Sequence, residues 1–242
     1  MLKRDAEVTV LSLDLDETLW QMEGVIEQAE RAMHAHLWTN HPAVATAYPP
    51  ERMRQLSTNI AATNPSLKHN VTALRLRTLE HAVLETGAPR ALADEAFAVF
   101  MEARHHVRLY PDAIPLLELL HKRLPLVALT NGNADVQRLG MGHYFAASCS
   151  AADVGAAKPD RSIFEAAADR AGISLHNLIH VGDDPLTDVA GAAQHGLRAV
   201  WLNRSGSPWP EHAPWVTHDE ITSLDELPGV LTRLQPDLAR LE

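Results

Sequence analysis

Asp14 and Asp16 are separated by one residue and end an apolar, β-branched run over residues 7–14. Side chains two apart on an extended chain point to the same side, so these two carboxylates can share one small volume. Close, desolvated carboxylates need a cation or a shared proton to coexist. Taken alone, the cluster is equally typical of a solvated turn in which Thr18 caps a helix.

Polar residues also follow a second apolar run, at residues 124–129. Thr130 supplies a hydroxyl, and the backbone N–H groups of Asn131 and Gly132 come next in a predicted strand-to-helix turn. A hydroxyl with successive N–H groups at such a turn can bind an anion. The alternative is an ordinary Asn-Gly turn without a ligand.

A lysine opens the third cluster. Lys158 precedes Pro159 and Asp160, and Asp160 can cap the helix that follows. The helix dipole disfavours a cation at this end of a helix, so the position suggests that an anion lies nearby. An ordinary surface lysine is the alternative.

The fourth cluster carries three carboxylates within six residues, because Asp183, Asp184 and Asp188 follow the apolar run at residues 178–181. This density suggests a hard cation, and Mg²⁺ takes one or two carboxylates together with waters and phosphate oxygens. The alternative is a polar loop whose last aspartate caps a helix. His180 lies inside the apolar run and is predicted to be a core residue rather than a ligand.

The elements that must position these residues alternate along the chain. Apolar periodicity between the runs predicts helices, one of which ends at Gly172 as a C-cap. Strands alternating with helices predict an α/β fold, a doubly wound parallel sheet covered on both faces. Its ligand site is expected beyond the carboxyl ends of the strands. The predicted strands lie at residues 7–14, 124–129, 178–181 and 198–202.

Three of the clusters directly follow predicted strands and the Lys158 cluster opens a predicted helix, and we expect the fold to gather all four at one edge of the sheet. Four of these carboxylates beside a single lysine would repel one another unless a divalent cation joined them. A cation, an anion cradle and a nucleophilic carboxylate together indicate aspartyl-phosphate chemistry. The residues expected to meet there are Asp14, Asp16, Thr130, Lys158, Asp183 and Asp188.

Residues 20–107 interrupt the alternation. They contain repeated helical periodicity and no convincing strand, with turn signals such as Pro49-Pro50 and Asn64-Pro65. We therefore predict an all-helical cap domain at residues 20–107, inserted into a core formed by residues 1–19 and 108–242.

The composition, the net charge and the length of the apolar runs exclude several classes of protein. The 242 residues are 46% hydrophobic and 21% charged, as in ordinary globular proteins, and the net charge of −10 disfavours nucleic-acid binding. The apolar runs are too short to cross a membrane, no signal peptide is predicted, and Cys149 is the single cysteine. We expect a cytoplasmic protein whose partner is a small phosphorylated metabolite, and the oligomeric state stays open.

The four clusters resemble, in order and spacing, the motifs of the haloacid dehalogenase superfamily, and the helical insertion resembles the α-helical cap of that family. The resemblance implies that Asp14 is the nucleophile. It implies that Asp16 protonates the leaving alcohol and later activates water. Thr130, Asn131 and Lys158 would bind the substrate phosphate.

The same resemblance implies a Mg²⁺ cofactor. Its ligands would be the Asp14 side chain, the Asp16 backbone carbonyl and Asp183, with Asp184 or Asp188 acting directly or through water. The family pattern assigns no fixed role to Asp184.

A narrower resemblance concerns the bacterial members that dephosphorylate flavin mononucleotide and the ribitylamino-pyrimidine phosphate of riboflavin synthesis. It rests on the stretches around Thr130 and Asp183 and on a segment containing His69, Arg75 and Arg77. His69 and Arg75 are therefore candidates for substrate selection in the cap. Arg75 and Arg77 cannot share a helix face, so at most one is expected to point into the site.

Three alternatives stay open. A haloacid dehalogenase needs no proton donor for its halide leaving group, so Asp16 favours phosphoester hydrolysis. A phosphomutase on the same fold would share all four motifs. A non-catalytic interaction module would be natural if Asp14, Asp16 or Lys158 were missing, and all three are present.

Overall fold

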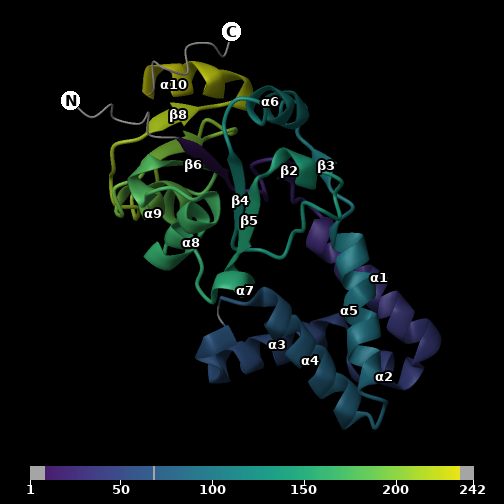
Figure 1. The fold of residues 1–242 in the computed structure, drawn as a ribbon. Coiled ribbons are helices and arrows are strands. Elements are labelled where there is room, and N and C mark those ends of the chain that lie inside the picture. The colour runs from purple at the N-terminus through teal and green to yellow at the C-terminus, as the bar shows by residue number, and fades with distance from the viewer. Residues whose placement is uncertain (1–8, 68, 235–242) are drawn as a thin grey trace. The chain divides into compact units, whose positions relative to one another are not determined.

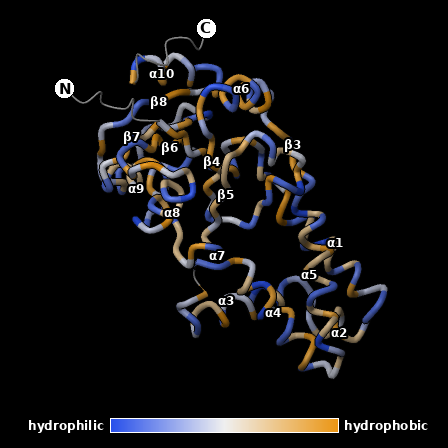
Figure 2. The backbone as a smooth tube through the Cα atoms, in the orientation of Figure 1, coloured by the Kyte–Doolittle hydropathy of each residue, from blue (hydrophilic) through white to orange (hydrophobic). Residues whose placement is uncertain are grey.

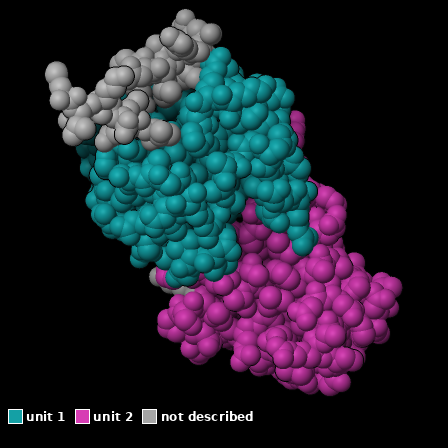
Figure 3. Space-filling model, viewed as in Figure 1, with its two compact units in different colours: residues 1–21, 109–131, 135–242 teal, residues 22–108, 132–134 magenta. Residues whose placement is uncertain are grey.

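The computed structural model describes residues 9–67 and 69–234, which form two compact units. The first unit, the core, contains the described residues up to 21, residues 109–131 and those from 135 onward (Figure 3). The second unit, the cap, contains residues 22–108 and 132–134. In the described part of the chain, no helix has the length and apolar character needed to cross a bilayer.

The core is built on a six-stranded sheet in which all the paired strands are parallel (Figure 1). The strand order is β5-β4-β1-β6-β7-β8, so β1 lies between β4 and β6. The strands are β1 (Val10–Leu13), β4 (Leu126–Thr130), β5 (Ala147–Ser150), β6 (Leu178–Gly182), β7 (Arg198–Leu202) and β8 (Asp219–Ile221).

The central strands are buried on both faces, which explains why their sequences are nearly continuous apolar runs (Figure 2). On one face, Val10 and Leu129 pack in a cluster with Ile163 and Phe164 of the helix α8. The core helices are α6 (Ala113–Leu120), α7 (Ala151–Val154), α8 (Arg161–Ala171), the π-helical turn η4 (Pro185–Ala190), α9 (Gly191–Ala193) and α10 (Leu227–Leu234). Short 3₁₀ turns complete the core at η2 (Gly142–Tyr144), η3 (Leu175–Asn177) and η5 (Leu224–Glu226).

The cap is helical and has its own hydrophobic core. Ala29 and Leu37 of the first cap helix pack in one cluster with Leu79, Val83 and Phe100. The cap helices are α1 (Val25–Asn40), α2 (Pro42–Ala47), α3 (Pro50–Thr63), the 3₁₀ turn η1 (Pro65–Leu67), α4 (Val71–Glu85) and α5 (Ala91–Arg104). The chain leaves and re-enters the core through a two-stranded sheet of β2 (Trp20–Gln21) and β3 (Arg108–Leu109).

The predicted α/β fold class, with its helical insertion, is confirmed. Asp160 caps α8 through a 2.9 Å hydrogen bond from the Ser162 N–H, and Gly172 ends this helix at a φ of 71°. Two core strands, β5 and β8, were not predicted. Residues 7 and 8 of the first predicted strand lie outside the described residues.

Candidate active site

The candidate residues of the core lie where strands β1, β4 and β6 end. Asp14 follows β1, Thr130 is the last residue of β4, and Asp183 follows β6. The chain runs from β1 to β4 and β5 on one side and then crosses to β6 on the other. Open α/β sheets bind ligands at such a switch point, so the topology alone favours a site beside Asp14.

Three carboxylates and one ammonium form the centre of this site, in which Asp14, Lys158 and Asp188 are buried and Asp183 is half-buried. Asp14, Asp183 and Asp188 each offer an oxygen within 4.8 Å of the others. The Nζ of Lys158 lies 2.5 Å from Asp14 Oδ1 and 2.6 Å from Asp188 Oδ1, and it donates to the Leu129 carbonyl at 3.0 Å. The Lys158 and Asp188 side chains are each only 2% exposed.

Burial and the contacts with Lys158 shift the pKa values of the three carboxyl groups in different directions. Burial raises the pKa of Asp14 well above its usual range, although Lys158 opposes this. Burial, with Asp188 nearby, raises the pKa of Asp183 to about 7. Lys158 and His180 outweigh the burial of Asp188 and hold its pKa below the ordinary value. Asp14 and Asp188 likewise outweigh the burial of Lys158 and raise its pKa, so the lysine stays charged.

This donor set fits a divalent cation. Three ionised carboxylates and one ammonium sum to −3 + 1 = −2, which a divalent ion would neutralise. The raised pKa of Asp14 and Asp183 shows that the protein alone leaves their charges under-compensated. Oxygen ligands of this kind suit Mg²⁺.

The structure separates the two aspartates between which the sequence left a choice. Asp184 is exposed, and its side chain accepts the Leu186 and Thr187 N–H groups as the cap of η4. Asp188 points back into the buried centre and also accepts the Asp184 N–H at 3.0 Å. A Cβ at Gly182 would lie 2.3 Å from the Asp188 carboxyl carbon, so glycine is required for this approach.

We expect Asp183→Ala to raise the Mg²⁺ concentration for half-maximal activity far more than Asp184→Ala. Because Asp183 is expected to be a direct ligand, its loss should cost at least the roughly 10–100-fold that is typical when a hydrogen-bond partner of a metal ligand is removed. Asp184→Ala should mainly lower stability, by about 1 kcal/mol, through the lost cap. The control Asp184→Asn retains a capping oxygen without the charge. The reverse order in Mg²⁺ titrations would reassign the ligand.

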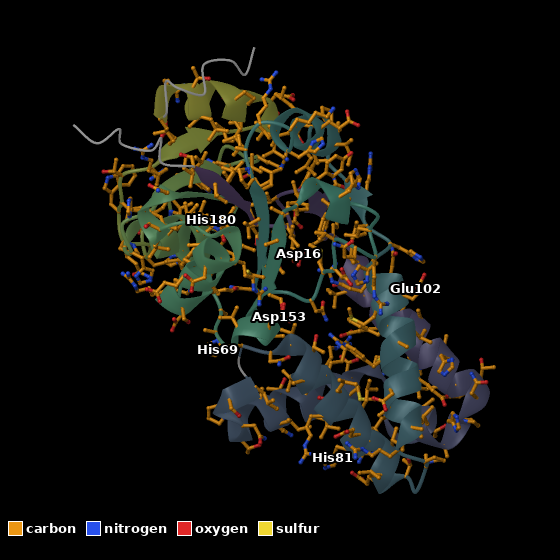
Figure 4. All side chains as sticks on the ribbon, in the orientation of Figure 1. Asp16, His69, His81, Glu102, Asp153 and His180 are labelled. Atoms are coloured by element: carbon orange, nitrogen blue, oxygen red, sulfur yellow. The ribbon has the colours of Figure 1, made fainter. Side chains whose placement is uncertain are left out.

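The two remaining core candidates have partners of their own. The Asn131 side chain accepts the Lys158 N–H at 2.7 Å and donates to the Lys158 carbonyl at 3.0 Å, so it ties the loop after β4 to the lysine. Asp16 (Figure 4) is half-buried, and its side chain accepts a 2.8 Å hydrogen bond from the indole N–H of Trp20. This bond orients the carboxylate two residues beyond Asp14.

A network of hydrogen bonds around Thr18 and Asp183 was not predicted from the sequence. Arg204 makes two hydrogen bonds to Asp112, at 2.8 and 2.9 Å, and one to the Thr18 carbonyl at 3.0 Å. Trp201 donates its indole N–H to the Asp183 carbonyl at 2.9 Å. These residues are far apart in the sequence and belong to no local motif, so no sequence signal pointed to them.

The two cap candidates lie in different surroundings. His69 is exposed in the turn before α4 (Figure 4). Arg75 is mostly buried, donates to Glu30 at 3.3 Å and stacks 3.8 Å above the Phe100 ring, beside a cap cavity of about 440 Å³. Arg77 is exposed and pairs with Glu80, so the two arginines point differently, as their spacing predicts.

Comparison with known proteins identifies the family. A family model described as a haloacid dehalogenase-like hydrolase matches residues 8–196. The curated 5-amino-6-(5-phospho-D-ribitylamino)uracil phosphatase YigB of Escherichia coli is 33% identical over 199 residues, covering 81% of this chain and 83% of that protein. The phosphoserine phosphatase of Thermus thermophilus is 36% identical, covering 58% of this chain and 59% of its own length.

A solved structure agrees with this assignment. A crystal structure described as a 2-haloacid dehalogenase from Pseudomonas syringae pv. tomato is 40% identical, with a TM-score of 0.86, and covers 94% of this chain and 99% of its own. The chain therefore belongs to the haloacid dehalogenase-like hydrolase family and is an enzyme of the phosphatase type.

Proposed function

We propose that this enzyme is a Mg²⁺-dependent phosphomonoesterase that works through an aspartyl-phosphate on Asp14. The observation that carries the proposal is the buried contact of Lys158 with both Asp14 and Asp188. The carboxylate of Asp183 lies beside them, and Asp16 follows Asp14 by two residues. The arrangement combines a nucleophile, a fixed cation and, on Asp16, a second carboxyl group that can move a proton.

In the first step, an Asp14 carboxylate oxygen attacks phosphorus while the bond from phosphorus to the ester oxygen breaks. Asp16, in its protonated form, gives its proton to the leaving alkoxide. In the second step, water attacks the phosphorus of the aspartyl-phosphate while the bond from phosphorus to the Asp14 oxygen breaks, and Asp16 takes a proton from that water. The products are an alcohol and inorganic phosphate, and Asp14 is regenerated.

Lys158 offsets negative charge on Asp14 and on the transferring phosphoryl group, and Asp188 holds the lysine in place. Thr130 and the Asn131 N–H are the proposed phosphate-binding groups at the end of β4. Mg²⁺, held by Asp14, the Asp16 backbone carbonyl and Asp183, would neutralise charge on the phosphoryl oxygens, and Asp188 would complete the site.

The reaction of a dehalogenase is the second candidate, because the 40% identical structure from Pseudomonas syringae is described as such an enzyme. That reaction releases halide, which leaves without a proton, and so it gives Asp16 no task. Incubation with a 2-haloacid and with p-nitrophenyl phosphate separates the two reactions. We expect phosphate release and no halide release. A phosphomutase would return a phosphorylated isomer instead of inorganic phosphate.

The proposed substrate is a phosphate of the riboflavin pathway, either flavin mononucleotide or its ribitylamino-pyrimidine precursor. Similarity to the YigB phosphatase over most of both chains supports this choice. We expect kcat/KM for flavin mononucleotide or the precursor to exceed the values for sugar phosphates and nucleoside monophosphates. If a simple sugar phosphate is turned over about ten times more efficiently, the substrate assignment fails while the phosphatase reaction stands.

His69 and Arg75 are the proposed specificity residues of the cap. A matched pair of variants tests the first: His69→Ala should raise KM for the flavin substrate, while His81→Ala, also an exposed histidine and lying on α4, should not. Neither should alter turnover of p-nitrophenyl phosphate.

A further inference from the structure

His180 lies in the middle of β6 (Figure 4), and each of its ring nitrogens has a hydrogen-bond partner. Its Nε2 is 3.1 Å from Asp188 Oδ1, and its Nδ1 is 2.8 Å from the hydroxyl of Ser12 on β1. Ser12 and His180 face each other in the register of the two strands, and the side chain of His180 has no exposed surface. The histidine predicted as a core residue is therefore buried, and it also contacts the candidate site.

The partners determine which nitrogen carries the proton. The Asp188 carboxylate can only accept a hydrogen bond, so Nε2 of His180 must donate one. A neutral ring then has its lone pair on Nδ1, which accepts from the Ser12 hydroxyl at 2.8 Å in preference to the Ile179 carbonyl, which lies 3.3 Å from the same hydroxyl. Burial lowers the pKa of His180, in agreement with a neutral ring.

Three donors consequently fix the Asp188 carboxylate. Oδ1 accepts from His180 and from Lys158, and Oδ2 accepts the N–H of Asp184. The orientation of this carboxylate sets where the Lys158 ammonium can lie, and the same ammonium contacts Asp14. One continuous buried chain of polar contacts therefore runs from Ser12 through His180, Asp188 and Lys158 to Asp14.

We propose that His180 is a positioning residue for the phosphatase reaction: held in one tautomer by Ser12, it orients Asp188 and thereby keeps Lys158 against Asp14. The inference rests on the proposed function for its kinetic consequence, but the tautomer and the effect on cation binding can be measured without turnover. Removing a hydrogen bond that orients a residue beside a metal or a reacting group typically changes metal affinity or activity by about 10–100-fold.

Two substitutions separate a hydrogen-bonding role from simple packing. In His180→Gln the side-chain amide reaches the place of Nε2 and can still donate to Asp188. In His180→Asn the shorter amide reaches only the place of Nδ1, near Ser12. Phe164→Leu is the packing control, because the Phe164 ring lies edge-on to the His180 ring at 5.3 Å without taking part in the hydrogen bonds.

We expect His180→Asn to lower kcat for p-nitrophenyl phosphate by about 10–100-fold with little change in KM, and to weaken Mg²⁺ binding measured by calorimetry. His180→Gln should keep both values within a few-fold of wild type. Phe164→Leu should lower the thermal midpoint while leaving kcat unchanged. In wild type, ¹⁵N NMR should show the tautomer protonated at Nε2, with the signal assigned by its loss in His180→Gln.

A His180→Asn enzyme with wild-type kcat and Mg²⁺ affinity would overturn the inference, and so would the tautomer protonated at Nδ1. If kcat and Mg²⁺ affinity fell equally in His180→Asn and His180→Gln, in proportion to the fall in thermal midpoint, His180 would have only a packing role. If wild type released no phosphate while the tautomer and the Mg²⁺ affinities followed the expectation, the proposed function would fail and the positioning of Asp188 would stand.

Discussion

Asp14→Asn should abolish phosphate release while leaving the protein folded. An amide has nearly the shape of a carboxyl group and is a poor nucleophile, so we expect kcat to fall by about 10⁴-fold or more. The fold should tolerate the change, because burial already raises the pKa of Asp14 and favours an uncharged group at this position. Lys158 would keep its contacts with Asp188 and the Leu129 carbonyl.

The measurement is kcat for p-nitrophenyl phosphate, with circular dichroism to check the fold. A variant that retained roughly a tenth of wild-type kcat would remove Asp14 from the role of nucleophile. Asp16→Asn is the matched control, because it retains the nucleophile and removes the proton donor. Its loss should be smaller for p-nitrophenyl phosphate, whose leaving group needs little protonation, than for an alkyl phosphate.

Removal of Mg²⁺ should have an effect of similar size. Without the ion, ionised carboxylates of the cluster would repel a phosphate dianion and a protonated Asp14 would be a poor nucleophile, so exhaustive chelation should reduce turnover to background and added Mg²⁺ should restore it. Activity that survived chelation would contradict the account.

The affinity for Mg²⁺ should also depend on pH in a defined direction. Below a pKa of about 7, Asp183 holds a proton that a cation must displace. The Mg²⁺ concentration for half-maximal binding should therefore fall as the pH rises from about 6 to about 8. Calorimetric titrations at the two pH values test this.

Much of the core could be predicted because its central strands are buried on both faces. Strands β1, β4, β6 and β7 are apolar runs for that reason. β5 is different, because its sequence Ala-Ser-Cys-Ser is short, partly exposed and lies at the edge of the sheet. Neither periodicity nor apolar content distinguishes such a segment from a loop.

The meeting of the candidate residues Asp14, Asp183 and Asp188 follows from one rule, that polar residues after parallel strands lie at the same edge of the sheet. The choice between Asp184 and Asp188 did not follow from it. Asp184 caps the turn η4 that it precedes, whereas the side chain of Asp188 occupies the space that the missing Cβ of Gly182 leaves free. Spacing along the chain contains neither fact, since both depend on the three-dimensional course of η4.

The link between His180 and Asp188 was hidden for a related reason. A histidine within an apolar run is correctly predicted to be buried, but its hydrogen-bond partners come from β1 and from η4. These contacts appear only when the strand register is known. The hydrogen-bond partners of a buried polar side chain such as His180 therefore depend on the three-dimensional structure and are not encoded in a local motif.

The most direct test of the account is to trap the phosphorylated enzyme and find the modified residue. An aspartyl-phosphate is an acyl phosphate, which borohydride reduces to homoserine, so acid quenching during turnover followed by reduction and peptide mapping marks the nucleophile. We expect homoserine at position 14 in wild type and in Asp16→Asn, and none in Asp14→Asn. Homoserine at another aspartate, or an unmodified Asp14 during steady release of phosphate, would contradict the central claim.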